Sequence, residues 1–165
     1  MYDIAIIGGG PAGVTAAIYA ARKKLKTLFL TKDIGGQIVW TSEIENYPGF
    51  KSIKGEELAI KFEEHHEKFE MDTKRENAEE ITKENNIFKI KTKKNSYESK
   101  TVVIATGRKP RELGVKGEEE FKNKGVAYCA TCDAPLFEGK DVAVMGGGNS
   151  ALEAVMQLMK IANKI

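Results

Sequence analysis

The sequence predicts an α/β fold built around a parallel sheet. Two stretches share one design, a short apolar strand followed by a glycine turn and a helix: IAIIGGGPAG begins at Ile4, and VAVMGGGNSA begins at Val142. Residues 2–31 have the length and pattern of one βαβ unit, which joins parallel strands through a helix. A further apolar run, TVVIA over residues 101–105, is typical of a buried strand.

The first unit is the most regular. Residues 2–7 are short, apolar and β-branched, which indicates a buried strand. Pro11 to Lys24 has helical character, with proline in the first turn, where its missing N–H is harmless. KTLFLT, residues 26–31, is the second strand.

The middle of the chain adds four elements. Turn-forming residues fill 35–49, a helix is expected over 54–69, charged and apolar residues alternate over 71–100, and the buried strand at 101–105 follows. The alternation predicts a small antiparallel β layer. In the helix, His65 falls in the apolar spacing and is expected to lean on the core.

The last third begins with a connector, residues 108–117, that contains Pro110 and two glycines. Short strands are expected at 126–128 and 142–145, and a helix over 149–162. That helix is expected to bury its apolar residues, namely Leu152, Val155, Met156 and Met159.

Composition narrows the function classes. The formal net charge of +2 gives no broad electrostatic reason to expect nucleic acid or an anionic membrane as partner. No secretory signal is visible, and no run approaches the ~20 apolar residues that span a bilayer. A cytoplasmic location is expected, where thiols are usually reduced.

The first glycine turn fits a dinucleotide fingerprint. Gly8 permits the tight turn, Gly10 lets the backbone approach a pyrophosphate, and Gly13 lets the helix pack on the strand. The helix N-terminus then presents free N–H groups to the phosphates. A plain βα turn is the alternative. An acid for the ribose is expected at the end of the second strand, but the chain has Thr31, which could bind a hydroxyl, followed by Asp33.

The second turn, Gly146-x-Gly148-x-x-Ala151, also follows an expected strand and precedes a helix. Alanine is allowed in its third place. The confirming second strand is missing from the sequence pattern, so a plain βα turn is again the alternative.

Both cysteines lie in one motif, YCATCD, as Cys129 and Cys132. A zinc site usually needs four ligands, and the other candidates, His65 and His66, point about 100° apart on a helix. A structural disulfide is unusual in a reducing compartment, and inert thiols stay open. A redox pair explains the position between two dinucleotide turns, since such a chain can pass electrons from nicotinamide to flavin to disulfide.

Five motifs in register resemble the low-molecular-weight thioredoxin reductases. They are IIGGGPAG, GGQ with ENYPG, ATG at 105–107, CATCD and GGGNSALE. The resemblance covers essentially the whole chain. The stretch CDAPLFEGKDVAV also resembles the flavoprotein subunit of alkyl hydroperoxide reductase.

The resemblance implies a Rossmann-like FAD/NAD(P)-binding fold of the three-layer ββα type, with an FAD-binding domain over 1–112 and the start of an NAD(P)H-binding domain over 113–165. It implies FAD and NADPH as cofactors, with NADH not excluded, a thioredoxin-like disulfide as substrate, and a homodimer. Because the family's chains are longer, the fold is expected to be incomplete at the C-terminus. The chain alone is then expected to bind FAD weakly or not at all, and a catalytically incompetent remnant is the alternative.

The resemblance also implies residue roles. FAD would contact Gly8, Gly10, Pro11, Ala12, Gly13, Gly35, Gly36, Gln37 and Asn46; Thr31, Ala105, Thr106 and Gly107 are counted with the cofactor-binding residues. The nicotinamide dinucleotide would contact Gly146, Gly148, Asn149 and Ser150. Cys132 would face the flavin, Cys129 would attack the partner disulfide, and Asp133 would exchange protons. Ala134 stands where the family often has glycine.

Overall fold

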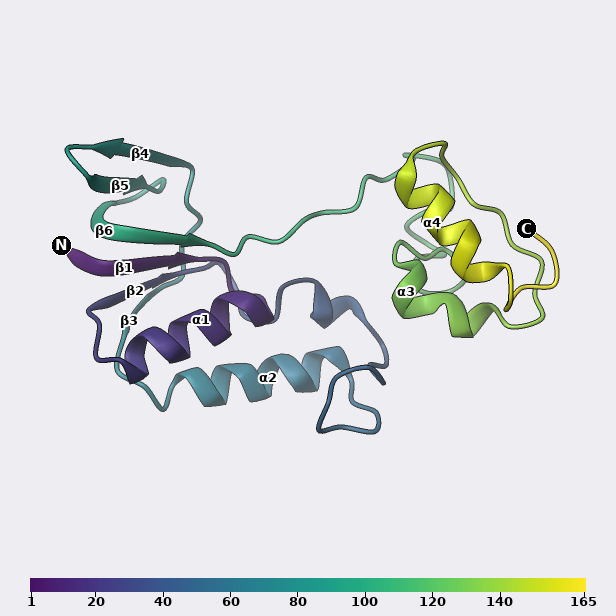
Figure 1. Ribbon diagram of the computed structural model, residues 1–165, viewed down its shortest axis with the longest axis horizontal. Coiled ribbons are helices and arrows are strands. Elements are labelled where there is room, and N and C mark those ends of the chain that lie inside the picture. Colours follow the sequence, from purple (N-terminus) through teal and green to yellow (C-terminus); the bar gives the residue numbers. More distant parts are fainter. The chain divides into compact units, whose positions relative to one another are not determined.

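A six-stranded mixed sheet organises the first 109 residues of the computed structural model, which describes residues 1–165 (Figure 1). Its strands are β1 (Tyr2–Ile7), β2 (Thr27–Leu30), β3 (Asp72–Lys74), β4 (Glu80–Glu84), β5 (Ile87–Lys91) and β6 (Ser96–Ile104). They lie in the order β3-β2-β1-β6-β5-β4. The first four in that order run parallel, whereas β5 is antiparallel to β6 and β4 to β5. The predicted α/β fold is confirmed.

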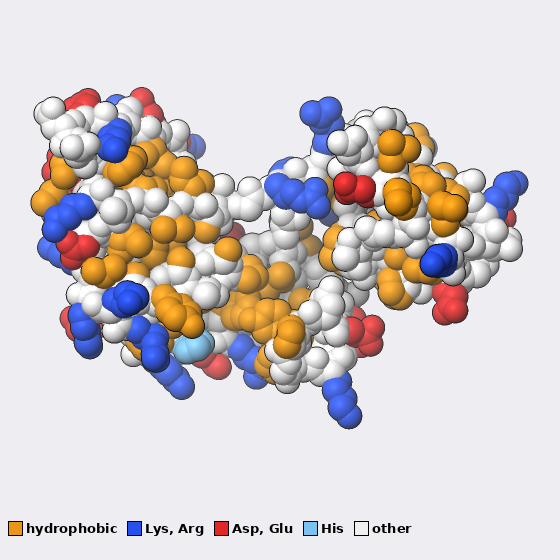
Figure 2. Space-filling view, viewed as in Figure 1, with side chains coloured by type: hydrophobic (Ala, Val, Ile, Leu, Met, Phe, Trp, Pro, Cys, Tyr) orange, Lys and Arg blue, Asp and Glu red, His pale blue; other side chains and the backbone are white.

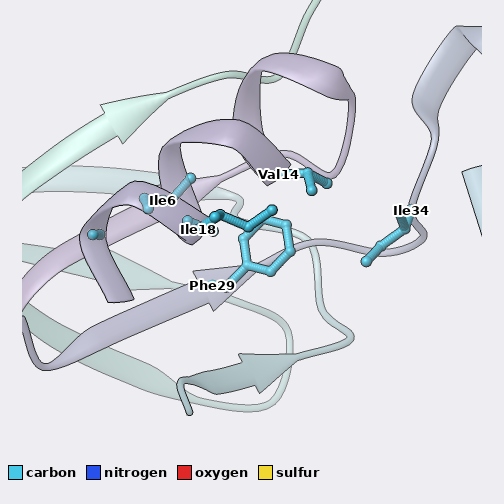
Figure 3. Packing of buried hydrophobic residues seen from close by; sticks show 7 residues of the cluster. Ile6, Val14, Ile18, Phe29 and Ile34 are labelled. Atoms are coloured by element: carbon cyan, nitrogen blue, oxygen red, sulfur yellow. The ribbon is translucent and has the colours of Figure 1, made fainter. Parts of the chain in front are cut away.

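Two helices cover one face of the parallel strands. They are α1 (Pro11–Arg22) and α2 (Gly55–His66). Ile6 of β1 and Phe29 of β2, both fully buried, point toward Val14 and Ile18 of α1 (Figure 3). Since neighbouring residues of a strand face opposite ways, Ala5 of β1 and Leu28 of β2 face away from the helices.

The opposite face packs on the antiparallel strands. Leu28 and Leu30 of β2 form a second buried cluster with Ile90 of β5, and Phe88 packs against its edge. Helices, parallel strands and antiparallel strands thus make three layers. The small antiparallel β layer expected over 71–100 forms in part: β4 and β5 pair antiparallel with each other, and β5 pairs antiparallel with β6. Residues 72–74 differ from the prediction, because they pair in parallel with β2.

The helical stripe of α2 differs from the prediction by one residue. His66 is 4% exposed and lies edge-on to the Phe29 ring, with 5.7 Å between ring centroids. His65, which was expected to lean on the core, is exposed. The reason is the helical period, because Leu58, Phe62 and His66 follow one another at four-residue steps and form the buried side.

Residues 110–165 form a second compact unit. It contains α3 (Ala130–Asp133), the 3₁₀ turns of residues 134–137, and α4 (Asn149–Leu158). The strands expected at 126–128 and 142–145 are wrong, since only isolated bridges form, between Lys122 and Val126 and between Asp141 and Lys164. A strand needs neighbouring strands for its N–H and C=O groups, and residues 142–145 pair with none; the Val142 N–H donates to the Lys164 carbonyl at 2.9 Å.

The expected burial of α4 is also largely wrong. Leu152, Met156 and Met159 are 60%, 71% and 68% exposed, and Leu158 is the buried residue of the helix. Val155 is half-buried. Figure 2 shows hydrophobic side chains on the surface over α4. The apolar side chains of α4 are exposed for the same reason that residues 142–145 form no strand: the second unit has no sheet for them to pack against.

The chain thus divides after Lys109, three residues before the predicted domain boundary. That the two units bind FAD and NAD(P)H respectively stays a prediction. None of the helices has the length and apolar character that crossing a membrane would require.

Candidate functional site

The first glycine turn is fixed between the ends of three strands. The Gly8 N–H donates to the Leu30 carbonyl at 2.9 Å, and the Ala105 N–H donates to the Ile7 carbonyl at 2.8 Å. Gly8 has a φ of 113°, a conformation that residues with a side chain rarely adopt. The chain therefore turns sharply at the carboxyl edge of the sheet, where ligands of open α/β sheets bind.

Close packing explains two glycines of this turn. A Cβ on Gly13 would lie 1.8 Å from the Gly8 carbonyl oxygen, so only glycine lets α1 approach the strand. A Cβ on Gly9 would lie 2.1 Å from the Asp33 carbonyl oxygen and 2.3 Å from the Thr31 hydroxyl. Gly9 was not among the expected site residues, although three successive glycines are a visible signal in the sequence.

Gly10 is different, because a Cβ there would meet nothing within 4 Å. It is the N-cap of α1, and no side chain caps that helix end. The helix N-terminus therefore keeps N–H groups and a partial positive charge facing an open side of the turn. Such a place fits the pyrophosphate of a dinucleotide such as FAD.

The GGQ segment lies beside this open turn. The Gly35 N–H donates to the Gly9 carbonyl at 2.8 Å, and a Cβ on Gly36 would lie 3.3 Å from the Gly10 Cα. Gly36 begins a 3₁₀ turn, residues 36–40, and the Gln37 side-chain amide donates to the Arg108 carbonyl. The structure thus brings together the first turn, the GGQ segment and the strand end at Ala105. That these residues contact FAD stays a prediction.

The remaining expected FAD-site residues of the first unit differ in their surroundings. The Thr31 side chain is buried, and its hydroxyl donates to the Asp33 carbonyl at 2.7 Å, so the hydroxyl serves this local turn. Asn46 is exposed in the loop between the 3₁₀ turn and α2, and Thr106 and Gly107 are exposed beyond β6. Pro11 and Ala12 form the first residues of α1.

In the second unit, the two cysteines form a disulfide. Their Cα atoms are 5.3 Å apart, and Cys129 caps the one-turn helix α3. The Cys132 N–H lies 3.1 Å from the Cys129 carbonyl oxygen and 3.3 Å from its Sγ. Cys132 is exposed and Cys129 is half-buried, so a thiol reagent can reach the pair.

Asp133 and Ala134 follow the disulfide. Burial raises the pKa of the Asp133 carboxyl, which favours its protonated form and suits a group that exchanges protons. Ala134 has a φ of −51° and a ψ of −40°, ordinary helical values. Alanine in place of the family's common glycine therefore causes no backbone strain.

The second glycine turn has the open geometry of the first. Gly146 has a φ of 121°, and Gly148 is the N-cap of α4 without a capping side chain. A Cβ on Gly148 would meet nothing within 4 Å. Asn149 and Ser150 are exposed in the first turn of α4, which packs against α3. No cluster of three His, Cys, Asp or Glu side chains in the chain has the geometry of a metal site.

Comparison with known proteins identifies the family. Residues 2–165 match the family described as pyridine nucleotide-disulphide oxidoreductase. The chain belongs to this family. The description names an oxidoreductase family whose reactions involve a pyridine nucleotide and a disulfide.

Individual members of the family are similar over the whole chain. A thioredoxin reductase from Bacillus subtilis is 42% identical over 100% of this chain and 52% of its own length. An NADH dehydrogenase from the same organism is 44% identical over 99% of this chain and 32% of its own length. The crystal structure of thioredoxin reductase from Streptococcus pyogenes superposes with a TM-score of 0.91 at 47% identity, covering 98% of this chain and 53% of the other. The chain thus spans a third to about half of the length of these relatives.

Proposed function

We propose that this chain carries the FAD cradle and the redox pair of an NAD(P)H-dependent flavoprotein disulfide reductase. Its electrons would pass from NAD(P)H through FAD to Cys129–Cys132, and on to a thioredoxin-like protein disulfide. The observation that carries the proposal is the accessible disulfide at the start of α3. The same chain holds two glycine turns, each followed by a helix whose N-terminus has no capping side chain.

The first unit would hold FAD. Gly10 and the N-terminus of α1 would receive the pyrophosphate, Gly9 and Gly13 keep the turn tight enough for that approach, and the GGQ segment would line the flavin side. Bound FAD supplies an acceptor for the hydride of NAD(P)H and a donor of two electrons to a disulfide.

The second unit would hold the nicotinamide cofactor at the turn of Gly146 and Gly148, with Asn149 and Ser150 beside the phosphates. NADPH and NADH both fit this proposal, since the residues of this turn would contact the phosphates that the two cofactors share. The relative named NADH dehydrogenase makes NADH a real alternative.

The cysteines would complete the transfer. Two electrons and two protons open the Cys129–Cys132 bond to a dithiol, with Cys132 taking the electrons and Asp133 handling one proton. The Cys129 thiolate then attacks the partner's disulfide and forms a mixed disulfide, which Cys132 resolves as the intramolecular bond re-forms. The partner leaves as a dithiol.

The deciding experiment uses the native protein that carries this sequence. Cys132→Ser is expected to reduce thioredoxin-disulfide reduction to background, while NAD(P)H oxidation with ferricyanide continues at the wild-type rate. Thr131→Ser, between the cysteines, is the matched control and is expected to keep both activities. Persistent disulfide reduction in Cys132→Ser would contradict the cysteine assignment.

A second candidate follows from the relative named NADH dehydrogenase, in which electrons would leave from the flavin without the cysteines. It predicts that nicotinamide oxidation with the physiological acceptor survives replacement of both cysteines. An alkyl hydroperoxide reductase flavoprotein would instead need the cysteines and a peroxidase partner. A catalytically incompetent remnant would oxidise no NAD(P)H with any acceptor at saturating FAD.

A homodimer in the native protein is part of the leading proposal, and light scattering tests it.

A further inference from the structure

Glu118 gathers four hydrogen bonds in the second unit. Its carboxylate accepts the Leu113 N–H at 2.9 Å, the Gly114 N–H at 2.7 Å and the Val115 N–H at 3.4 Å. It also accepts the Tyr128 hydroxyl at 2.7 Å. The residue is only 7% exposed, although the next two residues, Glu119 and Glu120, are exposed. A carboxylate so placed joins two segments that are distant along the chain.

The two segments are the connector and the residue before the redox pair. Leu113 to Val115 lie in the second half of the connector, and Tyr128 immediately precedes Cys129. Between them the chain is folded tightly, because the Val126 N–H donates to the Phe121 carbonyl at 2.9 Å. The ammonium of Lys122 lies 5.7 Å from the centre of the Tyr128 ring. Tyr128 is thus held at its hydroxyl and on its ring face.

The charges at neutral pH keep this contact intact. The backbone N–H groups and the Tyr128 hydroxyl lower the pKa of the Glu118 carboxyl, so it stays ionised. The hydrogen bond to Glu118 raises the pKa of Tyr128 to about 12, so its hydroxyl stays protonated. A charged acceptor and a neutral donor form the stronger class of hydrogen bond.

We infer that Glu118 and Tyr128 are positioning residues for the redox pair, an inference that rests on the proposed disulfide-reductase function. Their contact, here called the Glu118–Tyr128 clasp, fixes the backbone from which Cys129 projects. When the disulfide opens, the clasp keeps the Cys129 sulfur near Cys132 and favours closure of the ring. The second half of the connector and the CxxC motif then act as one rigid piece.

Thermodynamic reciprocity separates positioning from a purely structural role. If the clasp favours the disulfide, the disulfide must favour the clasp by the same factor. A contact that only stabilises the unit would be equally strong in both redox states, and would leave the disulfide equilibrium unchanged. The equilibrium between dithiol and disulfide is therefore the informative quantity.

The experiment equilibrates the 165-residue chain with mixtures of reduced and oxidised dithiothreitol. Closing the reagent's ring transfers two electrons and two protons to Cys129–Cys132, and alkylation followed by mass spectrometry counts the free thiols. Tyr128→Phe removes only the hydroxyl, and is expected to shift the equilibrium about fivefold toward the dithiol, the size typical of one lost hydrogen bond. Tyr19→Phe, at an exposed tyrosine of the first unit, is expected to leave the equilibrium unchanged.

A double-mutant cycle tests whether the two residues act through one contact. Glu118→Gln is expected to shift the equilibrium at least as far as Tyr128→Phe, and adding Tyr128→Phe to it is expected to change little. Glu120→Gln makes the same charge change at an exposed neighbour and is expected to have no effect. If Glu118→Gln unfolds the second unit, Tyr128→Phe alone decides.

Hydrogen exchange of the unmodified chain gives an independent answer. The Leu113, Gly114 and Val115 amides, which donate to Glu118, are expected to exchange about fivefold faster in the reduced than in the oxidised protein, by the reciprocity above. Equal exchange in both redox states, or an unchanged dithiothreitol equilibrium in Tyr128→Phe, overturns the clasp. Neither measurement needs FAD, NAD(P)H or a protein partner, so the reductase proposal can fail in the Cys132→Ser assay while the clasp stands, and the reverse.

Discussion

The two glycine turns are alike in local geometry and unlike in everything around them. Gly8 and Gly146 have nearly equal positive φ values, 113° and 121°. The Ile4 N–H donates to the Lys26 carbonyl at 3.5 Å, and at the same spacing along the chain the Val142 N–H donates to the Lys164 carbonyl at 2.9 Å. Both segments therefore return alongside their starting point, as a βαβ unit does.

The difference is in the neighbours. β1 pairs with β2 on one side and with β6 on the other, whereas the segment before Gly146 pairs with no strand. α1 packs on buried Ile6 and Phe29, whereas α4 exposes its apolar side. The comparison shows that a glycine turn and helix start are encoded locally, while a strand and a helix's buried face require the sheet.

The largest expected effect comes from removing a core side chain on one side of this comparison. Phe29→Ala leaves a cavity under α1 and is expected to lower the free energy of unfolding of the first unit by about 3–5 kcal/mol. Trp40 is the single tryptophan and lies in this unit, so urea unfolding followed by its fluorescence reports the change.

Leu152→Ala in α4 is the matched truncation in the second unit. Because Leu152 is 60% exposed, its loss is expected to change stability by no more than about 0.5 kcal/mol, measured by circular dichroism. A cost of several kcal/mol would show that α4 buries this side chain in solution.

A smaller effect is expected from adding one methyl group to each turn. Gly9 and Gly147 occupy equivalent positions, but a Cβ on Gly9 would lie 2.1 Å from the Asp33 carbonyl oxygen and one on Gly147 would meet nothing within 4 Å. Gly9→Ala is expected to destabilise the first unit by about 1–3 kcal/mol, as overpacking does.

Gly147→Ala is expected to be nearly neutral, within about 0.5 kcal/mol. Thermal unfolding of both variants, followed by Trp40 fluorescence and by circular dichroism, makes the measurement. Equal effects at the two positions would mean that the second turn is packed as tightly as the first.

The same comparison shows what sequence patterns could predict. The helix predicted at 11–24 and the strand predicted at 26–31 match α1 and β2 closely, because in each the local pattern agrees with the tertiary surroundings. Residues 142–145 have the apolar pattern of a strand but do not form one, because no neighbouring strand pairs with them. Apolar periodicity in α4 likewise predicted burial that only a neighbouring sheet could provide.

In the candidate site, residues whose role is local were predictable and residues whose role is a distant contact were not. Gly8, Gly10 and Gly13 of the first turn and the cysteine pair stood out in the sequence, whereas Gly9 did not. Glu118 did not, because it lies in a run of three glutamates and only the fold shows which of them is buried. The wrong prediction that His65, and not His66, packs on the core has a similar cause, since the buried face of a helix can shift by one residue without changing its period.

The smallest expected effect contrasts two tyrosine–carboxylate pairs, one in each unit. The Tyr2 hydroxyl donates to Asp72, and burial together with this bond raises the pKa of Tyr2 from 10 to about 12. The Tyr128 hydroxyl donates to Glu118, and that bond raises its pKa to about 12 as well. A raised pKa favours the protonated form in the folded state, so each pair's contribution is complete below pH 10 and is lost as the pH rises through 12.

Tyr2→Phe is therefore expected to flatten the decline in stability of the first unit between pH 10 and 12, measured as the urea midpoint of Trp40 fluorescence. Tyr128→Phe is the control: it should remove one late-titrating phenol from the ultraviolet titration and leave that decline as steep as in the wild type. A Tyr2→Phe protein that loses stability as steeply as the wild type would contradict the Tyr2–Asp72 contribution. If Tyr128→Phe also flattened the decline, the two units would be energetically coupled, and the contrast between a sheet-supported turn and an unsupported one would have to be redrawn for the assembled chain.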